Sequence, residues 1–460
     1  MHGLHFHHRS AVKRRDVDMT QGSILGHIIR FALPLLLGNL FQQMYNMVDT
    51  WVVGNYVSNE AYSAVGSVGF ITNTLISFFL GLAAGAGVVI GQYYGAGQED
   101  KVQQTVHTAI AMTLGLGVIF TGLGIFMIPF MLDVMNMPAS VRPEATTYLT
   151  IYFAGVIGLM LYNIGAGILR AVGDSKRPFY FLLVCAVLNT MFDLLFVLAF
   201  DMGVAGVAIA TILSQGVSAV LVIITLMRSR NCIKLRLKKI RIHWDIMKKV
   251  FHIGFPTALQ MSITSFGNVF VQSYINFFGP DCISAWTTYN KVDAVITLPT
   301  QSFSVAVTTL VSQNLGAGKM ERVRQGVKAG MAIALSSAVV LMIPVIVFAP
   351  HLAAFFNGKA AVVEYASMFL RFLTPGYLIW CVYTIHVGAL RGMGNTKIPT
   401  IIGLTSFVAF RQVYSFAMSK ICNEIMPIAL SYPLAWLIAA VAVTIYYHKV
   451  KNRNTSLVDK

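Results

Sequence analysis

Residues 92–97 read QYYGAG, and 221 positions later residues 313–318 read QNLGAG. The same offset relates LRAVGDSKRP at residues 169–178 to LRGMGNTKIP at residues 390–399. Recurrence of several segments at one period is the signature of an internal structural repeat. The chain is therefore expected to consist of two equivalent halves.

The composition places both halves in a membrane. Of the 460 residues, 56% are hydrophobic and only 11% are charged, and the mean hydropathy of +0.68 is far too apolar for a soluble protein. The apolar stretches run to roughly 20 residues or more, whereas the strands of an outer-membrane barrel need only about 10 with strict alternation. An all-α membrane protein is therefore expected.

Twelve apolar stretches are long enough to cross a membrane as helices. Six fall in each half, and because six is even, both halves enter the membrane in the same direction. We predict two six-helix bundles related by a pseudo-two-fold axis along the membrane normal. The predicted spans are residues 28–53, 61–90, 105–131, 145–168, 178–200, 203–227, 250–277, 283–311, 326–349, 362–387, 398–418 and 427–447.

This arrangement divides the chain into five parts. They are a tail at residues 1–27, a bundle at 28–227, a basic linker at 228–249, a second bundle at 250–447 and a tail at 448–460. Most of the 34 Lys and Arg residues then fall on one side of the membrane, so the positive-inside rule places both termini in the cytoplasm of a bacterial inner membrane. The formal charge of +16 is thus a topology signal and does not indicate a nucleic-acid partner.

Two basic segments leave alternatives open. The linker joins the two halves, and its Lys and Arg side chains also offer contacts to anionic lipid headgroups. The first 18 residues are polar and basic without an apolar core, so a cytoplasmic tail is expected rather than a cleavable secretory leader. Either Met1 or Met19 is the translation start.

Polar side chains inside two equivalent spans mark the expected transport path. Polar groups in hydrocarbon cost free energy unless they face a cavity or a partner. The spacing of three or four places each set on one helix face, and we expect both faces to line a central substrate cavity; hydrogen bonding between helices is the alternative. The set consists of Asn39, Gln42 and Asn46 in the first span and Gln260, Thr264, Asn268 and Gln272 in the seventh.

Acidic side chains point to a coupling site in the N-terminal half. Asp49 lies in the first span, and Asn189 and Asp193 lie one turn apart in the fifth, so the latter two share a helix face. Their oxygens suit a proton or a hard cation, with a structural hydrogen-bond network as the alternative. In the second half the equivalents of the two aspartates are Val271 and Tyr414, which confines the acidic pair to the first half.

Lys291 and Asp293 in the eighth span and Arg411 in the eleventh are further charged residues within predicted spans. Lys291 and Asp293 are two residues apart on one helix and do not face each other, so each needs a partner elsewhere. Arg411 in the eleventh span is a candidate partner for Asp293 in a structural ion pair. Pro34 in the first span is expected to bend that helix.

No motif for catalysis or nucleotide hydrolysis is apparent. GxxxxGK[ST], HExxH and GxSxG are absent, and the five cysteines lack metal-binding spacing, so neither an enzyme nor a resident cofactor is expected. Transport energy would then come from an ion gradient.

The motifs together resemble one transporter family. They are PLLLGNLFQQMYNMVDTWVVG from Pro34, GQYYGAG from Gly91, LRAVGDSKRP from Leu169, LNTMFDLLF from Leu188 and SQNLGAG from Ser312. In order and in both halves, these segments look like the multidrug and toxic compound extrusion family, over about residues 19 to 450. The resemblance implies two six-helix bundles around a central cavity, and export of organic cations and other amphipathic drugs against inward sodium or proton flow.

The resemblance also implies specific residues. The family's cation site falls on Asp49, Asn189, Asp193 and Thr211, with Pro34 as the bend of the first helix. This set of residues is similar to the cation site of the family branch whose acidic site lies in the N-terminal half. Another branch carries an acidic residue in the seventh helix, where this chain has Gln260.

The same features leave a few alternatives to drug export. A flippase for a lipid-linked precursor or another amphiphile is the alternative transporter, although twelve rather than fourteen helices disfavour it. An ion channel or a membrane enzyme is a weaker candidate. A channel would predict conductance without counter-ion coupling, and an enzyme would need a catalytic constellation that is not visible. We expect a monomer in contact with membrane lipids and small amphipathic or cationic substrates, with sodium or protons as the coupling ion.

Overall fold

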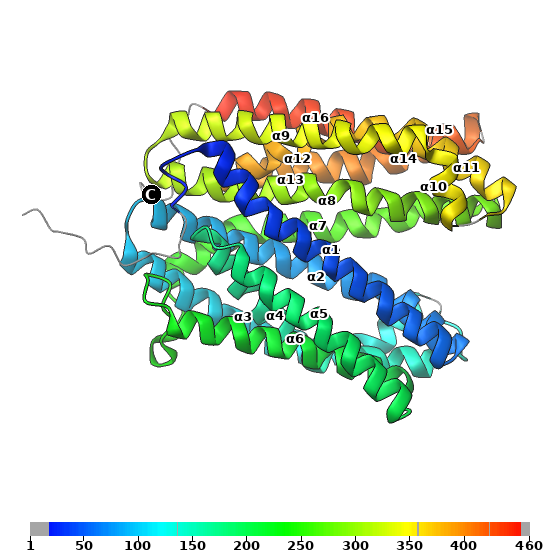
Figure 1. Ribbon diagram of the computed structural model, residues 1–460, viewed down its shortest axis with the longest axis horizontal. Helices are drawn as coiled ribbons and strands as arrows, with labels where there is room; N and C mark the ends of the chain where they lie inside the picture. Colours follow the sequence, from blue (N-terminus) through cyan, green and yellow to red (C-terminus); the bar gives the residue numbers. More distant parts are fainter. Residues whose placement is uncertain (1–17, 136, 357, 423, 452–460) are drawn as a thin grey trace, which may run out of the picture.

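The computed structural model describes residues 18–135, 137–356, 358–422 and 424–451, where the regular elements are all helices (Figure 1). The N-terminal half comprises α1 (Ile24–Tyr56), α2 (Asn59–Gly95), α3 (Glu99–Val134), α4 (Arg142–Ala171), α5 (Lys176–Leu194) with a π-helical turn η1 (Leu195–Ala199), and α6 (Gly203–Arg228). The short 3-10 turn η2 (Leu237–Lys239) follows. The C-terminal half comprises α7 (Trp244–Asn276), α8 (Pro280–Gly316), α9 (Met320–Val347), α10 (Ala349–Phe356), α11 (Ala360–Leu373), α12 (Tyr377–Gly392), α13 (Lys397–Leu404), α14 (Arg411–Ile421), α15 (Ile425–Ala429) and α16 (Ser431–Val450).

These helices form the predicted membrane spans. Eleven stretches within the described residues are long and apolar enough to cross a membrane. Helix α7 takes the remaining place in the order, and its 33 residues reach about 50 Å at 1.5 Å per residue. Four spans are composite: α5 continues into η1, η3 (Thr374–Gly376) joins α11 to α12, the π-helical turn η4 (Thr405–Phe410) joins α13 to α14, and α15 continues into α16. The prediction of twelve helices in two six-helix bundles is confirmed.

The internal repeat is visible in the backbone. Gly97 and Gly318, related by the offset of 221, both have φ of +71°. Gly173 and Gly394, related by the same offset, have φ of +84° and +80°. A residue with a Cβ rarely adopts this left-handed conformation, so glycine is required in all four turns. The repeated glycines therefore encode repeated turns.

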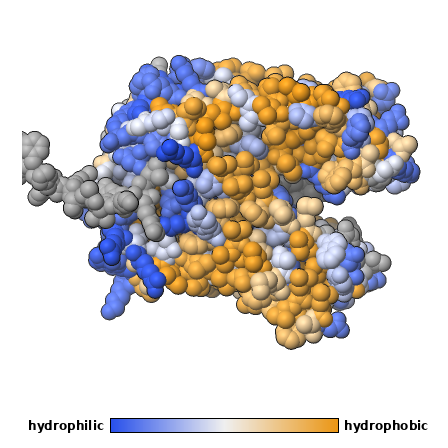
Figure 2. All heavy atoms as spheres, in the orientation of Figure 1, coloured by the Kyte–Doolittle hydropathy of each residue, from blue (hydrophilic) through white to orange (hydrophobic). Residues whose placement is uncertain are grey.

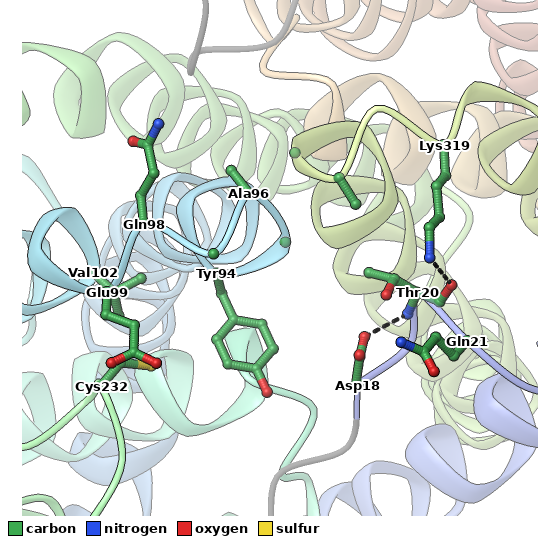
Figure 3. Close-up of a pocket in the computed structure, with 14 residues that line it drawn as sticks. Asp18, Thr20, Gln21, Tyr94, Ala96, Gln98, Glu99, Val102, Cys232 and Lys319 are labelled. Atoms are coloured by element: carbon green, nitrogen blue, oxygen red, sulfur yellow. Dashed lines mark hydrogen bonds between the residues drawn. The ribbon is translucent and has the colours of Figure 1, made fainter. Parts of the chain in front are cut away.

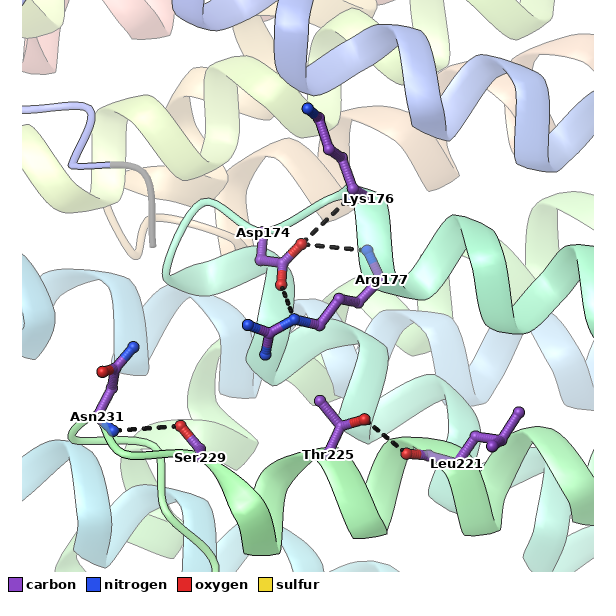
Figure 4. Close-up of polar contacts among 7 residues, drawn as sticks. All are labelled: Asp174, Lys176, Arg177, Leu221, Thr225, Ser229 and Asn231. Carbon is purple, nitrogen blue, oxygen red and sulfur yellow. Dashed lines mark hydrogen bonds and ion pairs between the residues drawn. The ribbon is translucent and has the colours of Figure 1, made fainter. Parts of the chain in front are cut away.

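The turn before α5 shows how one of these connections is stabilised (Figure 4). The Asp174 carboxylate accepts hydrogen bonds from the backbone N–H groups of Lys176 and Arg177, at 3.2 and 3.1 Å, and pairs with Arg177 Nε at 3.0 Å. A carboxylate at a helix N-terminus satisfies free N–H groups and interacts favourably with the helix dipole. These contacts hold the start of α5 in place, and the same helix carries Asn189 and Asp193 of the candidate site further along.

The two halves meet at one end of the molecule, which we call the closed end. Helices α2 and α8 are so close there that a Cβ at Gly95 would overlap the carbonyl of Gln313, and a Cβ at Gly316 would overlap that of Gln92. Gln92 Nε2 donates to the last carbonyl of α12 at 2.9 Å, and Gln313 Nε2 donates to the last carbonyl of α4 at 2.8 Å. The contacts come in pairs because the halves are repeats.

A segment before α1 strengthens the closed end; we call residues 18–23 the strap. Met19 is only 1% exposed, and its N–H donates to Gln313 Oε1 at 3.0 Å. The Met19 carbonyl accepts hydrogen bonds from Asn314 Nδ2 and Arg322 Nη2, both at 3.1 Å. Arg322 Nη2 also donates to the Gly22 carbonyl at 3.1 Å. The strap continues into α1 of the N-terminal half, yet all these partners belong to the C-terminal half.

A cavity of about 600 Å³ lies beside the strap (Figure 3). Its walls are the strap, the turn between α2 and α3 and the turn between α8 and α9. Lys319 Nζ donates to the Thr20 carbonyl at 2.8 Å, and the Thr20 N–H donates to Asp18 Oδ1 at 2.9 Å. This cavity lies at the closed end and contains none of the predicted site residues.

Each half contributes the start of its first helix to the other half. Ile28, Phe31 and Ala32 of α1, together with Met19, belong to the apolar core of the C-terminal half. Ile246, Val250 and Ile253 of α7 belong to a core of the N-terminal half. The remainder of α1 packs against α5 in its own half. The halves are therefore interlocked at the closed end.

At the opposite end the two halves separate. Figure 2 shows the surface hollowed between them there, and it shows a broad hydrophobic zone between the hydrophilic ends. We call this end the open end. The hydrophobic zone matches the hydrocarbon region that the twelve spans require.

Candidate functional site

The acidic residues predicted in the N-terminal half lie together. Asn189 and Asp193 share one face of α5, and both are 0% exposed. The half-buried carboxyl of Asp49 on α1 lies beside both side chains. The packing of α1 against α5 creates this contact between residues that are far apart in sequence. Three of the four residues predicted for the cation site thus form one cluster.

The cluster is short of hydrogen-bond partners. Asp49 Oδ1, both side-chain polar atoms of Asn189 and both carboxylate oxygens of Asp193 are buried without a partner among the described residues. Buried polar groups in proteins are normally hydrogen-bonded, and a buried charge without a partner costs several kcal/mol. A proton would remove the charge of one carboxylate, and a small cation would balance it. The donor set therefore fits either ion.

Two tyrosines of α4 complete this surface and were not predicted from the sequence. Tyr148 lies beside Asp49, Asp193 and Thr211, and its ring stacks on that of Tyr152 at a centroid distance of 6.1 Å. Thr211 Oγ1 on α6 donates to the carbonyl of its own helix four residues earlier, at 3.0 Å. Thr211 therefore belongs to the same region, with Tyr148 between it and the acidic residues. The sequence signal for this pair was the spacing of four residues, which places both rings on one face of a helix.

The polar residues predicted to line a cavity differ between the halves. Gln260 on α7 is buried, and its Nε2 donates to the Tyr383 hydroxyl of α12 at 2.6 Å. Asn268 is exposed, and its Oδ1 accepts a hydrogen bond from Arg411 Nη2 of α14 at 2.7 Å. Gln260 and Asn268 thus make hydrogen bonds between helices, which was the alternative to lining a cavity. Gln272 bonds within α7, to Asn276 at 2.8 Å.

The remaining members of the polar set are partly or fully exposed at the surface of the structure. Asn39 and Gln42 of α1 and Thr264 of α7 are half-buried, and Asn46 is exposed. Pro34 is half-buried within α1, and the helix continues through it from Ile24 to Tyr56.

The ion pair suggested for Lys291, Asp293 and Arg411 is not formed within the described structure. Asp293 Oδ1 accepts a hydrogen bond from the Tyr377 hydroxyl at 2.5 Å. Arg411 is bonded to Asn268, and its guanidinium stacks on the Tyr432 ring at 4.5 Å. Lys291 is exposed, and its Nζ lies 5.4 Å from the centre of the Phe356 ring. Asp293 thus has a hydroxyl partner in place of a cation, and Lys291 and Arg411 have aromatic partners in place of a carboxylate.

Comparisons with known proteins agree with this architecture. A family model described as MatE matches residues 34–195 and again residues 256–416, one match in each half. The chain is 28% identical over 430 residues to the probable multidrug resistance protein YpnP of Bacillus subtilis, covering 94% of this chain and 96% of that protein. It is 27% identical over 439 residues to the probable multidrug resistance protein YoeA of the same organism, covering 93% and 95%.

Similarity to a solved structure concerns the fold. A structure described as the outward-facing conformation of a multidrug resistance MATE family transporter superposes on this chain with a TM-score of 0.90. The superposition covers 96% of this chain and 99% of that chain at 20% sequence identity. The two-bundle arrangement is therefore shared.

Proposed function

This chain belongs to the MatE family, a family of membrane transporters rather than enzymes, and from this premise we propose that it is a secondary antiporter. In this proposal it exports amphipathic or cationic drugs across the bacterial inner membrane in exchange for sodium ions or protons. Support for the drug substrate comes from the relatives, which are described as multidrug resistance proteins. Small-molecule transport across a membrane follows from the family itself.

The observation that carries ion coupling is the buried cluster of Asp49, Asn189 and Asp193 with its unpartnered oxygens. A charged carboxylate in this site is costly, so the site favours binding of a proton or sodium ion. Asp49 belongs to α1, whereas Asn189 and Asp193 belong to α5. An ion bound between them would draw the two helices together, and α1 also extends into the C-terminal half. Ion binding can therefore bias the relative position of the halves.

The proposed transport cycle follows from the two ends of the molecule. We place both termini, and with them the closed end, in the cytoplasm, so that this structure corresponds to the outward-facing state. Drug uptake from the cytoplasm then requires α2 and α8 to separate at Gly95 and Gly316 and the strap to leave its partners. Rocking of two bundles about a central site is the usual form of alternating access.

Asp193→Asn tests the coupling role. Asparagine keeps the shape of the side chain and its hydrogen-bonding capacity but removes the charge, so folding should be retained while gradient-driven export is lost. The measurement is drug transport by purified protein in proteoliposomes under imposed sodium or proton gradients, with monodispersity checked in parallel. Comparing the two gradients also identifies the coupling ion.

Asp133→Asn is the matched control. Asp133 is exposed and pairs with Arg142 at 2.6 Å outside the cluster, so its replacement should leave transport unchanged. Normal gradient-driven export by well-folded Asp193→Asn protein would contradict the proposed coupling site. In that case the cluster would serve only to join α1 and α5.

A further inference from the structure

The segment that joins the two halves, residues 229–243, is a folded element; we call it the connector. The Leu235 N–H donates to the Leu226 carbonyl at 3.0 Å, and the Arg236 N–H donates to His107 Nε2 at 3.0 Å. The His243 N–H donates to Thr108 Oγ1 at 3.1 Å. The connector is therefore fixed to the end of α6 and to α3 of the N-terminal half. A simple flexible tether would not need these contacts.

The inner face of the connector is apolar and packed. Ile233 and Leu235 are 1% and 2% exposed and belong to an apolar core of the N-terminal half. At the start of the connector the Asn231 N–H donates to Ser229 Oγ at 3.3 Å (Figure 4). Since one face is buried, the remaining side chains must point outward.

The outer face of the connector continues onto the start of α7, where Trp244 and Lys248 lie, and it combines positive charge with exposed apolar side chains. Leu237 and Trp244 are 56% and 64% exposed, although large apolar side chains of this kind are mostly buried in soluble proteins. Asp245 is the one acidic residue in the run from 229 to 248. The exposed basic residues of this face are Arg236, Lys238, Lys239, Arg241 and Lys248.

The position of this face matches the boundary of a membrane. The connector begins directly after α6 and ends directly before α7, and both helices are membrane spans. It thus lies where the apolar zone gives way to the hydrophilic end (Figure 2). Tryptophan is enriched at this level of a membrane, where its ring lies among headgroups. Clusters of Lys and Arg beside a span attract anionic lipid.

We propose that the outer face of the connector binds anionic phospholipid in the adjoining headgroup layer. The guanidinium and ammonium groups would pair with lipid phosphates, while Leu237, Ile242 and Trp244 enter the boundary of the acyl chains. Charge complementarity favours an anionic lipid over a zwitterionic one. The exposed apolar side chains favour a lipid over a soluble acidic partner, which would leave them in water. This binding does not depend on which drug is exported.

Brominated lipids provide the test, because bromine quenches tryptophan fluorescence only at short range. The full chain is reconstituted in vesicles that contain brominated phosphatidylglycerol or brominated phosphatidylcholine. The contribution of Trp244 is the difference between the unmodified chain and Trp244→Phe. Quenching of this contribution should be much stronger with the anionic lipid. Raising the salt concentration should remove the preference without any further substitution.

A triple variant with reduced positive charge tests which side chains of the connector bind the lipid. Lys238→Gln, Lys239→Gln and Arg241→Gln together should reduce the preference for the anionic lipid on the order of 100-fold at low ionic strength, at about fivefold per charge. The control variant removes three exposed lysines elsewhere at the closed end and should keep the preference. It carries Lys176→Gln, Lys328→Gln and Lys397→Gln.

Three results would overturn the proposal. Equal quenching of Trp244 by both lipids would show that the connector does not select anionic lipid. An unchanged preference in this triple variant would show that Lys238, Lys239 and Arg241 do not bind the lipid. An equal loss in both triple variants would show that net charge alone attracts the lipid.

Discussion

Replacing Arg322 by alanine should weaken the closed end without affecting the candidate ion site. Arg322 donates to the Met19 carbonyl, the Gly22 carbonyl and Asn314 Oδ1, each at 3.1 Å. A buried hydrogen bond from a charged group contributes about 1.5–3 kcal/mol, but Arg322 is half-buried, so water partly replaces what is lost. The bond to Asn314 stays within the C-terminal half, so only the two bonds to the strap count, and at reduced strength they amount to roughly 2 kcal/mol. The ratio of open to closed molecules should then rise about 30-fold.

A single cysteine at Ser312 measures this population. Ser312 is 1% exposed on α8 and its side chain packs against Gly91 of α2, so a cysteine at this position is protected while the end is closed. In a variant without the native cysteines, the rate of labelling by a thiol reagent follows the fraction of molecules that are open at this end. Arg322→Ala should raise the rate about 30-fold at a free-energy change of roughly 2 kcal/mol.

Arg324→Ala is the control for this prediction. Arg324 lies on the same helix and pairs with Glu321, one turn away, at 3.3 Å, so its loss should leave the labelling rate nearly unchanged. The same labelling rate in Arg322→Ala and in the parent would refute the reasoning, because the strap would then contribute nothing to closure. Equal acceleration by both variants would attribute the effect to lost charge on α9.

Three further outcomes can be checked. Gly316→Ala should open or destabilise the closed end, seen as faster labelling at the same cysteine, whereas Gly122→Ala should have little effect because a Cβ there meets no atom within 4 Å. Tyr148→Phe should raise the ion concentration for half-maximal drug transport about fivefold, since one hydroxyl near the cluster contributes about 1 kcal/mol. Asp293→Asn should retain gradient-driven transport, because asparagine still accepts the Tyr377 hydrogen bond; loss of coupling would place a second essential carboxylate in the C-terminal half.

Much of the fold could be predicted because it depends on properties that are local in sequence. Span length follows from the thickness of the hydrocarbon layer, and the repeat offset relates Gly97 to Gly318 and Gly173 to Gly394 before any coordinates are known. The strap was instead predicted as part of a tail at residues 1–27. Its order depends on Arg322, which is 303 positions from Met19, and a contact of that kind leaves no periodic pattern.

The candidate site was predictable only in part for the same reason. Asn189 and Asp193 are one helical turn apart, so their shared face is a local property. Tyr148 joins them through the packing of α4, and Arg411 turns to Asn268 and Tyr432 instead of a carboxylate. Partner choice among long polar side chains depends on helix rotation, which apolar periodicity determines only coarsely.

The interlocking of the halves constrains biosynthesis. When the ribosome has completed α6, residues Ile28, Phe31 and Ala32 have no core to enter, because that core is formed by helices not yet made. The early intermediate must therefore keep the start of α1 against lipid or a chaperone until α8 and α9 insert. Conversely, Ile246, Val250 and Ile253 find a finished docking surface as soon as α7 emerges. A chain severed within the connector would thus yield two fragments that become stable only when they are made together.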